Sequence, residues 1–233
     1  MYLEFREVLE DFVSLIYPKF CNACQNSLVK GEEIICTHCL LDLPRTNYHL
    51  TSNNPLMMRF RGRLDLTHAL AYLKFRKKGK VQHLLHALKY YGCTEIGYKL
   101  GLVYGEELKR TEISLQYDVI TAVPLHVSRL RQRGYNQSDE WARGLADSTK
   151  IPFRNDLLKR KLKTKTQTKR SKLGRWENVS EVFELKNEPS IEGKRILLVD
   201  DVVTTGSTLE SCGMLLLGAS CNALGIACLA VSE

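Results

Sequence analysis

Two neighbouring acids, Asp200 and Asp201, stand between an apolar run and a hydroxyl-rich turn. Residues 196–199 read Ile-Leu-Leu-Val, the composition of a strand buried on both faces that the two acids would end. The turn 204–208 reads Thr-Thr-Gly-Ser-Thr, and apolar residues then recur at helical spacing up to Gly218. Backbone N–H groups and the helix dipole converge at such a junction and favour a bound phosphate. We therefore expect a phosphate at the turn, and sugar hydroxyls and a substrate-bound Mg²⁺ at the acids.

The identity of this ligand is narrowed by what the turn lacks. A Walker A loop carries a lysine before its last Ser or Thr, and this turn has none, so a nucleoside triphosphate of that class is not expected. The alternative to a ligand-binding turn is an ordinary polar connection between a core strand and a helix, with no bound ligand. Segment 196–208 resembles the phosphoribosyl pyrophosphate (PRPP) site of type I phosphoribosyltransferases. The resemblance implies that Asp200 and Asp201 are the catalytic acids that hold the ribose hydroxyls. It assigns PRPP binding to Val202, Val203, Thr204, Thr205, Gly206, Ser207 and Thr208.

Four cysteines near the beginning of the chain form two C-x-x-C pairs separated by eleven residues. They are Cys21, Cys24, Cys36 and Cys39. Each pair can hold one edge of a tetrahedral zinc site with zinc–sulfur bonds of about 2.3 Å. Disulfides are the competing interpretation, which suits a reduced intracellular chain less well. A closed four-cysteine site leaves no open coordination position, so its Zn²⁺ would be structural. The other four cysteines show no pairing pattern and are expected to be buried or half-buried.

Residues 118–137 predict a second ligand-binding junction. The apolar run 119–123 reads as a parallel strand, and Pro124 ends its ladder because proline has no N–H to donate. Arginines follow at alternate positions, then a Gly-Tyr-Asn-Gln turn at 134–137 and a helix through 141–146. Ligands of open α/β sheets bind at the carboxyl ends of strands, which favours a functional role for this segment.

The pattern V-P-x-x-x-x-R-x-x-x-R-G-Y-N-Q resembles the ComF family of phosphoribosyltransferase-like proteins, as do segments 85–92 and 167–183. In type I enzymes the loop after this strand binds pyrophosphate through backbone amides. The resemblance therefore assigns pyrophosphate binding to Pro124, Leu125 and His126. Arg129 and Arg133 either join that site or form a solvated basic face, and their position at the strand end favours the site.

Residues 154–175 hold ten basic side chains and one acid, a net charge of +9 against +8 for the whole chain. Such local basicity should meet a polyanion, and the interleaved Thr and Ser residues predict a mobile, solvated loop. The resemblance implies a lid that closes over PRPP and shields the sugar from water. We assign Lys163 and Lys165 to pyrophosphate. We assign Lys169, Arg170, Lys172 and Arg175 to nucleic acid.

The remaining elements frame these sites. The spacing of apolar residues over 5–16 predicts an amphipathic helix, and residues 44–64 read as a linker. Two further helices are expected near 81–92 and 95–109. A strand at 223–231 should close the sheet. Apolar runs are too short to cross a bilayer, and the N-terminus lacks a basic signal-peptide region. We expect a cytoplasmic protein without membrane insertion.

Together these observations predict an α/β protein with a type I phosphoribosyltransferase fold, a mainly parallel sheet flanked by helices. Residues 1–59 would form a helix and zinc module, and residues 60–233 the phosphoribosyltransferase domain. The ComF resemblance implies a role in competence-linked DNA uptake, with partners such as single-stranded DNA, a DNA-uptake helicase or another competence protein. Transfer of phosphoribosyl from PRPP to an unidentified acceptor is one function. A non-catalytic module that senses PRPP and binds single-stranded DNA is the other.

Overall fold

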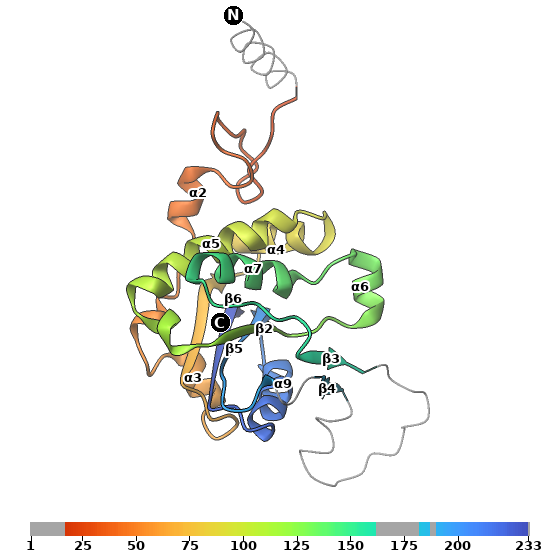
Figure 1. Ribbon diagram of the computed structural model, residues 1–233. Helices are drawn as coiled ribbons and strands as arrows, with labels where there is room; N and C mark the ends of the chain where they lie inside the picture. The colour runs from red at the N-terminus through yellow and green to blue at the C-terminus, as the bar shows by residue number, and fades with distance from the viewer. Residues whose placement is uncertain (1–16, 162–181, 187–189, 233) are drawn as a thin grey trace, which may run out of the picture.

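The computed structural model describes residues 17–161, 182–186 and 190–232. Its centre is a sheet of four parallel strands in the order β1-β6-β5-β2 (Figure 1). The strands are β1 (His68–Phe75), β2 (Val119–Ala122), β5 (Arg195–Val203) and β6 (Ala223–Ser232). β6 reads as one long apolar run because it lies inside the sheet, between β1 and β5, and is covered on both faces.

Helices cover both faces of the sheet (Figure 1). Side chains alternate along β5, so Leu197 and Val199 pack on one face and Ile196 and Leu198 on the other. The first face is covered by α4 (Lys80–Tyr90), α5 (Thr94–Arg110) and α7 (Gln137–Thr149). The second is covered by α3 (Pro55–Phe60) and α9 (Ser207–Gly218). Shorter elements are α2 (Thr37–Asp42), η1 (Tyr48–Leu50), η2 (Ile113–Gln116), α6 (Val127–Arg133), β3 (Leu158–Arg160) and β4 (Phe183–Leu185).

Two glycines let α5 and α7 pack backbone against backbone. A Cβ atom on Gly144 would lie 2.1 Å from the carbonyl oxygen of Tyr98, and one on Gly101 would lie 2.5 Å from that of Trp141. Any larger residue at either position would force the helices apart. This contact fixes α7, whose first turn faces the end of β5.

Irregular segments cover both edges of the sheet. Thr46 N donates to Tyr72 O at 3.0 Å and Lys74 N to Pro44 O at 2.8 Å, so residues 44–46 run along β1. Ile120 N donates to Pro152 O and Arg154 N to Ile120 O, each at 2.9 Å, so residues 152–154 run along β2. These bonds give partners to outer backbone groups of Tyr72 and Lys74 in β1 and of Ile120 in β2. Within the described ranges, no helix has the length and apolar character needed to span a bilayer.

Several sequence expectations need correction. The acids do not end their strand, because β5 continues to Val203 and stays paired with β6. The expected linker 44–64 contains η1 and α3, and β6 is an interior strand rather than the closing one. Residues 158–160 of the basic segment form β3, paired with β4, instead of a mobile loop. The predicted helix at 5–16 lies outside the described residues.

Candidate functional site

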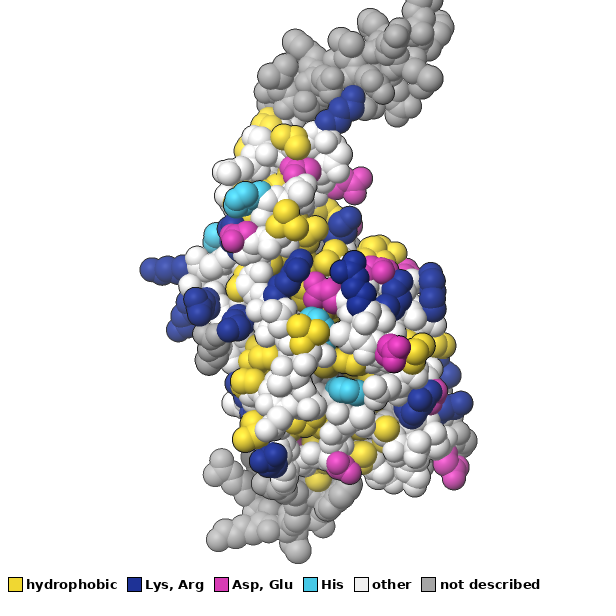
Figure 2. All heavy atoms as spheres, turned by 90° about the vertical axis from the view of Figure 1, so that its left-hand side faces the viewer, with side chains coloured by type: hydrophobic (Ala, Val, Ile, Leu, Met, Phe, Trp, Pro, Cys, Tyr) yellow, Lys and Arg dark blue, Asp and Glu magenta, His cyan; other side chains and the backbone are white. Residues whose placement is uncertain are grey.

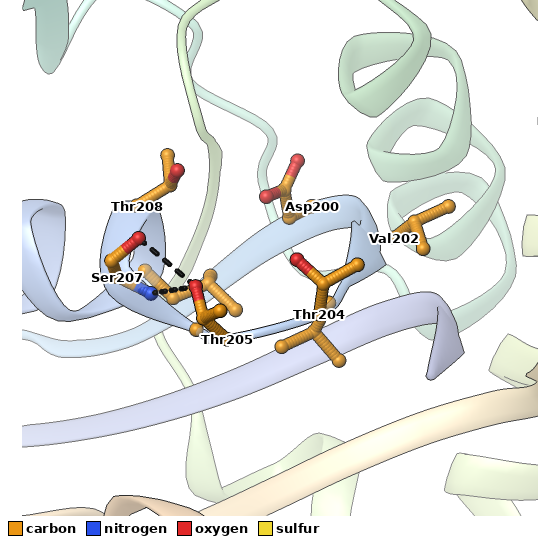
Figure 3. A pocket seen from close by; sticks show the side chains of 9 residues that line it. Asp200, Val202, Thr204, Thr205, Ser207 and Thr208 are labelled. Carbon is orange, nitrogen blue, oxygen red and sulfur yellow. Dashed lines mark hydrogen bonds between the residues drawn. The ribbon is translucent and has the colours of Figure 1, made fainter. Parts of the chain in front are cut away.

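A pocket lies where β5 passes into α9, lined by Asp200 and residues 202–209 (Figure 3). Gly206 is the N-cap of α9 and has φ +80°, a left-handed conformation that favours glycine. It also lies against α3, since a Cβ atom there would be 2.5 Å from the Phe60 ring. The first N–H groups of α9 have no partner within the helix, and the hydroxyls of Thr205 and Ser207 lie beside them, 3.1 Å apart. The turn therefore offers an anion several N–H and O–H donors.

Two arginines behind this turn fix the orientation of its peptide groups. Arg59 donates to the carbonyl oxygen of Thr204, and Arg63 donates to that of Thr205 at 3.1 Å. Arg63 is itself held by an ion pair with Glu210 of α9. Because a trans peptide places N–H opposite C=O, the N–H groups of Thr205 and Gly206 point away from these arginines. The turn is thus set before any ligand arrives, by two arginines that no local sequence pattern predicts.

Asp200 is constrained on two sides. Its Oδ1 accepts from Ser138 Oγ of α7 at 3.0 Å and from the N–H of Asp201 at 2.8 Å. Burial and the neighbouring Asp201 carboxylate raise the pKa of Asp200 to about 7, although both hydrogen bonds act in the opposite direction. A carboxyl group with such a pKa gains or loses its proton near neutral pH, as is common at functional sites.

Lys89 of α4 reaches the second acid. Its Nζ lies 2.6 Å from Asp201 Oδ2, and both side chains are largely buried. The lysine offsets part of the negative charge of the acid pair. Segment 85–92 carries the family resemblance, but periodicity alone could not show that this lysine, rather than an apolar neighbour, would face the site.

The Gly-Tyr-Asn-Gln turn joins the β2 side of the sheet to the acids. Gly134 ends α6 with φ +81°, and Tyr135 Oη donates to the carbonyl oxygen of Leu88 in α4. Asn136 caps α7 and donates from Nδ2 to Val123 O at 3.1 Å, while Gln137 Oε1 accepts from Arg133 at 2.9 Å. Each polar residue of the motif thus connects two elements around the site.

The residues expected to bind pyrophosphate lie in different parts of the chain, and only some of them are among the described residues. Pro124, Leu125 and His126 form the half-buried connection between β2 and α6, at the same end of the sheet as the acids. Arg129 and Arg133 lie on α6 rather than in a loop, and the guanidinium of Arg133 lies over the Tyr90 ring. Lys163, Lys165, Lys169, Arg170, Lys172 and Arg175 lie outside the described residues.

The four N-terminal cysteines come together as the spacing predicts. Their Sγ atoms all lie within 4.8 Å of one another, and Cys24 Sγ and Cys36 Sγ are 3.9 Å apart. Zinc–sulfur bonds of about 2.3 Å in a tetrahedron place sulfur atoms about 3.8 Å apart, so the cluster fits Zn²⁺. All eight cysteines are free thiols. Burial raises the pKa of Cys21, but the N–H groups of Cys36, Cys24 and Ala23 outweigh this and lower it to about 7.

This cluster touches the helix that carries Lys89. The His83 Nδ1 atom of α4 lies 3.0 Å from the Ala23 carbonyl oxygen. Ala23 is buried, and in the sequence it stands between Cys21 and Cys24. Lys80 at the start of α4 pairs with Asp42 at the end of α2 at 2.7 Å. The cysteine module therefore packs along α4 and belongs to the same apolar core.

The chain is similar to a known domain family and to several known proteins. The family described as phosphoribosyl transferase domain matches residues 133–232. The DNA utilization protein YhgH of Escherichia coli K12 is 30% identical over 217 residues, which cover 90% of this chain and 88% of that protein. Competence protein F of Haemophilus influenzae is 40% identical over 113 residues, 47% of this chain and about half, 48%, of the relative. Among solved structures, a glutamine PRPP amidotransferase from B. subtilis aligns with a TM-score of 0.44 and 21% sequence identity. The alignment covers 61% of this chain and 30% of the amidotransferase chain.

The parallel sheet, the acid pair and the matched domain together define a protein with a type I phosphoribosyltransferase fold and an N-terminal four-cysteine module. Within that class the chain belongs to the competence protein F (ComF) family.

Proposed function

We propose that the protein binds PRPP with Mg²⁺ and transfers its phosphoribosyl group to an acceptor, releasing pyrophosphate. The observation that carries the proposal is the junction of β5 and α9, where two carboxylates precede a turn whose donors face a pocket. The turn 204–208 holds the 5′-phosphate, and the carboxylates accept hydrogen bonds from the ribose 2′ and 3′ hydroxyls. The connection 124–126, with Lys163 and Lys165, holds the pyrophosphate.

These contacts support catalysis through position and charge. Binding the sugar at its phosphate and its hydroxyls fixes the anomeric carbon relative to the incoming nucleophile. Positive charge develops on the sugar as pyrophosphate leaves, and the carboxylates of Asp200 and Asp201 stabilise it. Mg²⁺ would be held by these carboxylates and the substrate phosphates, and it would neutralise the leaving group. The Zn²⁺ of the cysteine module would be structural.

A pyrophosphate-release assay tests the transfer step. The wild-type protein is incubated with PRPP, Mg²⁺ and a panel of nucleobases and amines, and the variant Asp200→Asn with Asp201→Asn serves as the inactive control. We expect release that depends on one class of acceptor and on both acids. Binding of PRPP without release for any acceptor would support the non-catalytic PRPP sensor instead.

The names of the relatives support a place in DNA uptake or utilization, and we propose the same for this chain. Single-stranded DNA and a helicase or other competence protein are the proposed partners, and the cytoplasm the proposed location. The boundary near residue 60 between the zinc module and the phosphoribosyltransferase domain stays a prediction.

A further inference from the structure

Three exposed aromatic rings gather where α4 ends. Tyr90 and Tyr91 are 60% and 71% exposed, and His86 lies one helical turn earlier. The His86 ring centroid is 4.7 Å from that of Tyr90 and 5.1 Å from that of Tyr91. We call these three residues the α4 aromatic cluster. Single exposed aromatic residues are common, but several in contact mark a surface that meets a partner.

The cluster is held in place by α6 and the turn that follows it. The Arg133 guanidinium lies 5.3 Å from the Tyr90 ring centroid, and its hydrogen bond to Gln137 keeps it there. Tyr135 donates to the carbonyl oxygen of Leu88 and fixes the last turn of α4. Figure 1 shows the α4–α5 connection and α6 on the same side of the molecule. The rings are therefore positioned before a ligand binds.

The charged side chains of α6 beside the cluster are all basic, although Glu95 at the start of α5 is an exposed acid four positions after Tyr91. α6 carries Arg129, Arg131 and Arg133 and no acid, and Arg129 and Arg131 are exposed. By contrast, basic and acidic side chains are interspersed on the face that Figure 2 shows, which is turned away from α6. Exposed aromatic rings beside arginines can stack bases and contact phosphates along one strand.

We propose that the α4 aromatic cluster and α6 form a binding face for single-stranded DNA, with bases stacked on Tyr90 and Tyr91 and phosphates at Arg129 and Arg131. A duplex fits less well because its bases are stacked on each other and offer no free face. A small ligand also fits less well, since such ligands occupy concave sites that bury most of their surface, and these rings are open.

This face is separate from the PRPP pocket but adjoins it. Lys89 leaves α4 between Leu88 and Tyr90 and reaches Asp201, whereas Tyr90 lies against Arg133 of α6. The end of α4 thus contacts both sites. The inference rests on the proposed role of single-stranded DNA as a partner and locates its binding face, and it does not require PRPP binding or the transferase function.

Fluorescence anisotropy with a labelled oligo-dT strand tests the proposal. The variant Tyr90→Ala with Tyr91→Ala should weaken binding roughly tenfold or more at about 200 mM salt. Phosphate contacts contribute less to affinity at this salt concentration than at low salt, so the loss of base stacking is easier to measure. Replacing both residues with Phe keeps the rings and should preserve affinity. Tyr98→Ala is the matched control, because Tyr98 of α5 is exposed but bonded to Asp147 of α7.

Two further arms make the result decisive. An abasic strand of equal length should bind the wild type as weakly as oligo-dT binds the double Ala variant, and PRPP affinity should be unchanged in that variant. If the double variant unfolds, Tyr91→Ala alone decides, since Tyr91 follows the helix and is mostly exposed. Equal DNA affinity in wild type and Ala variants, equal binding of abasic and oligo-dT strands, or no binding of oligo-dT by the wild type would overturn the proposal.

Discussion

Asp200 shows how a single residue can link the fold to the chemistry of the site. It lies inside a central strand, accepts a hydrogen bond from Ser138 of α7 and has Asp201 as its neighbour. Burial and the adjacent carboxylate raise its pKa to about 7, against about 3.9 for an unfolded aspartate. Between these two values the folded protein binds more protons than the unfolded chain.

This difference gives the first prediction. The contribution of Asp200 to the free energy of unfolding is largest below its unfolded pKa of about 3.9, falls as pH rises to its folded pKa of about 7, and stays at its lowest value above that pH. Asp200→Asn removes the titration while keeping an oxygen that can accept from Ser138. The variant should therefore melt at a higher temperature than wild type at pH 8, with a difference that shrinks steadily towards pH 4. Thermal unfolding across this pH range measures it, and a difference independent of pH would contradict the assigned titration.

At the residue scale, the sequence indicated the residues that line the pocket better than those that support them. The acid pair and turn 204–208 were predicted because their pattern is local. Lys89, Ser138 and Arg63 were not, because each meets the site through contacts with residues more than sixty positions away. Nothing in a single sequence fixes which side of a helix approaches which strand.

Among the elements, the six-residue helix α3 positions the turn after β5. Leu56 and Phe60 anchor it in the apolar core, and its end presents Arg59 and, just beyond, Arg63 to the turn after β5. Without these donors the carbonyl oxygens of Thr204 and Thr205 would lose partners that fix the turn. The element therefore orders the turn that lines the pocket, through direct contacts with its backbone.

A second prediction tests this role. Arg63→Gln should weaken PRPP binding by roughly tenfold, because a charge-assisted hydrogen bond contributes on the order of 1.5–3 kcal/mol. Calorimetric titration with PRPP and Mg²⁺ gives the affinity, and circular dichroism checks the fold. Arg61→Gln is the matched control, since Arg61 is exposed at the end of the same helix. Equal losses in both variants would indicate a general charge effect.

At the element scale, the long helices and most buried strands were predicted, but α3 and β1 were missed. Asn-Asn-Pro at 53–55 was interpreted as part of a linker, although Asn54 caps α3 and Pro55 is its first residue. β1 was not predicted because its pairing with β6 joins positions over 150 residues apart. The three residues of β3 likewise gain strand structure only from β4.

Across the whole molecule, α4 connects the cysteine module to the acid pair of β5. Ala23 contacts His83 on this helix, and Lys89 at its other end pairs with Asp201. Of the apolar side chains in residues 17–43, only Cys21, Ala23, Ile35, Cys39 and Leu43 are buried, so a bound metal would supply much of the stability of this segment.

A third prediction follows for the metal. Protein purified without added zinc should contain one Zn²⁺ per chain, and a strong chelator should lower the melting temperature and expose the N-terminal module to proteolysis. Cys39→Ser should behave like the chelated protein, whereas Cys221→Ser, a half-buried cysteine outside the cluster, should retain the metal. A folded, metal-free wild type would exclude the site.

The central claim is that PRPP binds at the junction of β5 and α9, and calorimetric titration with PRPP at pH 8 tests it most directly. Asp200 is mostly ionised at this pH. We predict binding by the wild type that requires Mg²⁺, at least a hundredfold weaker binding by Asp200→Asn with Asp201→Asn, and wild-type affinity in Asp65→Asn, which alters an exposed acid away from the pocket. Equal PRPP affinity in the wild type and the folded double variant would show that the ribose is bound elsewhere and contradict the account.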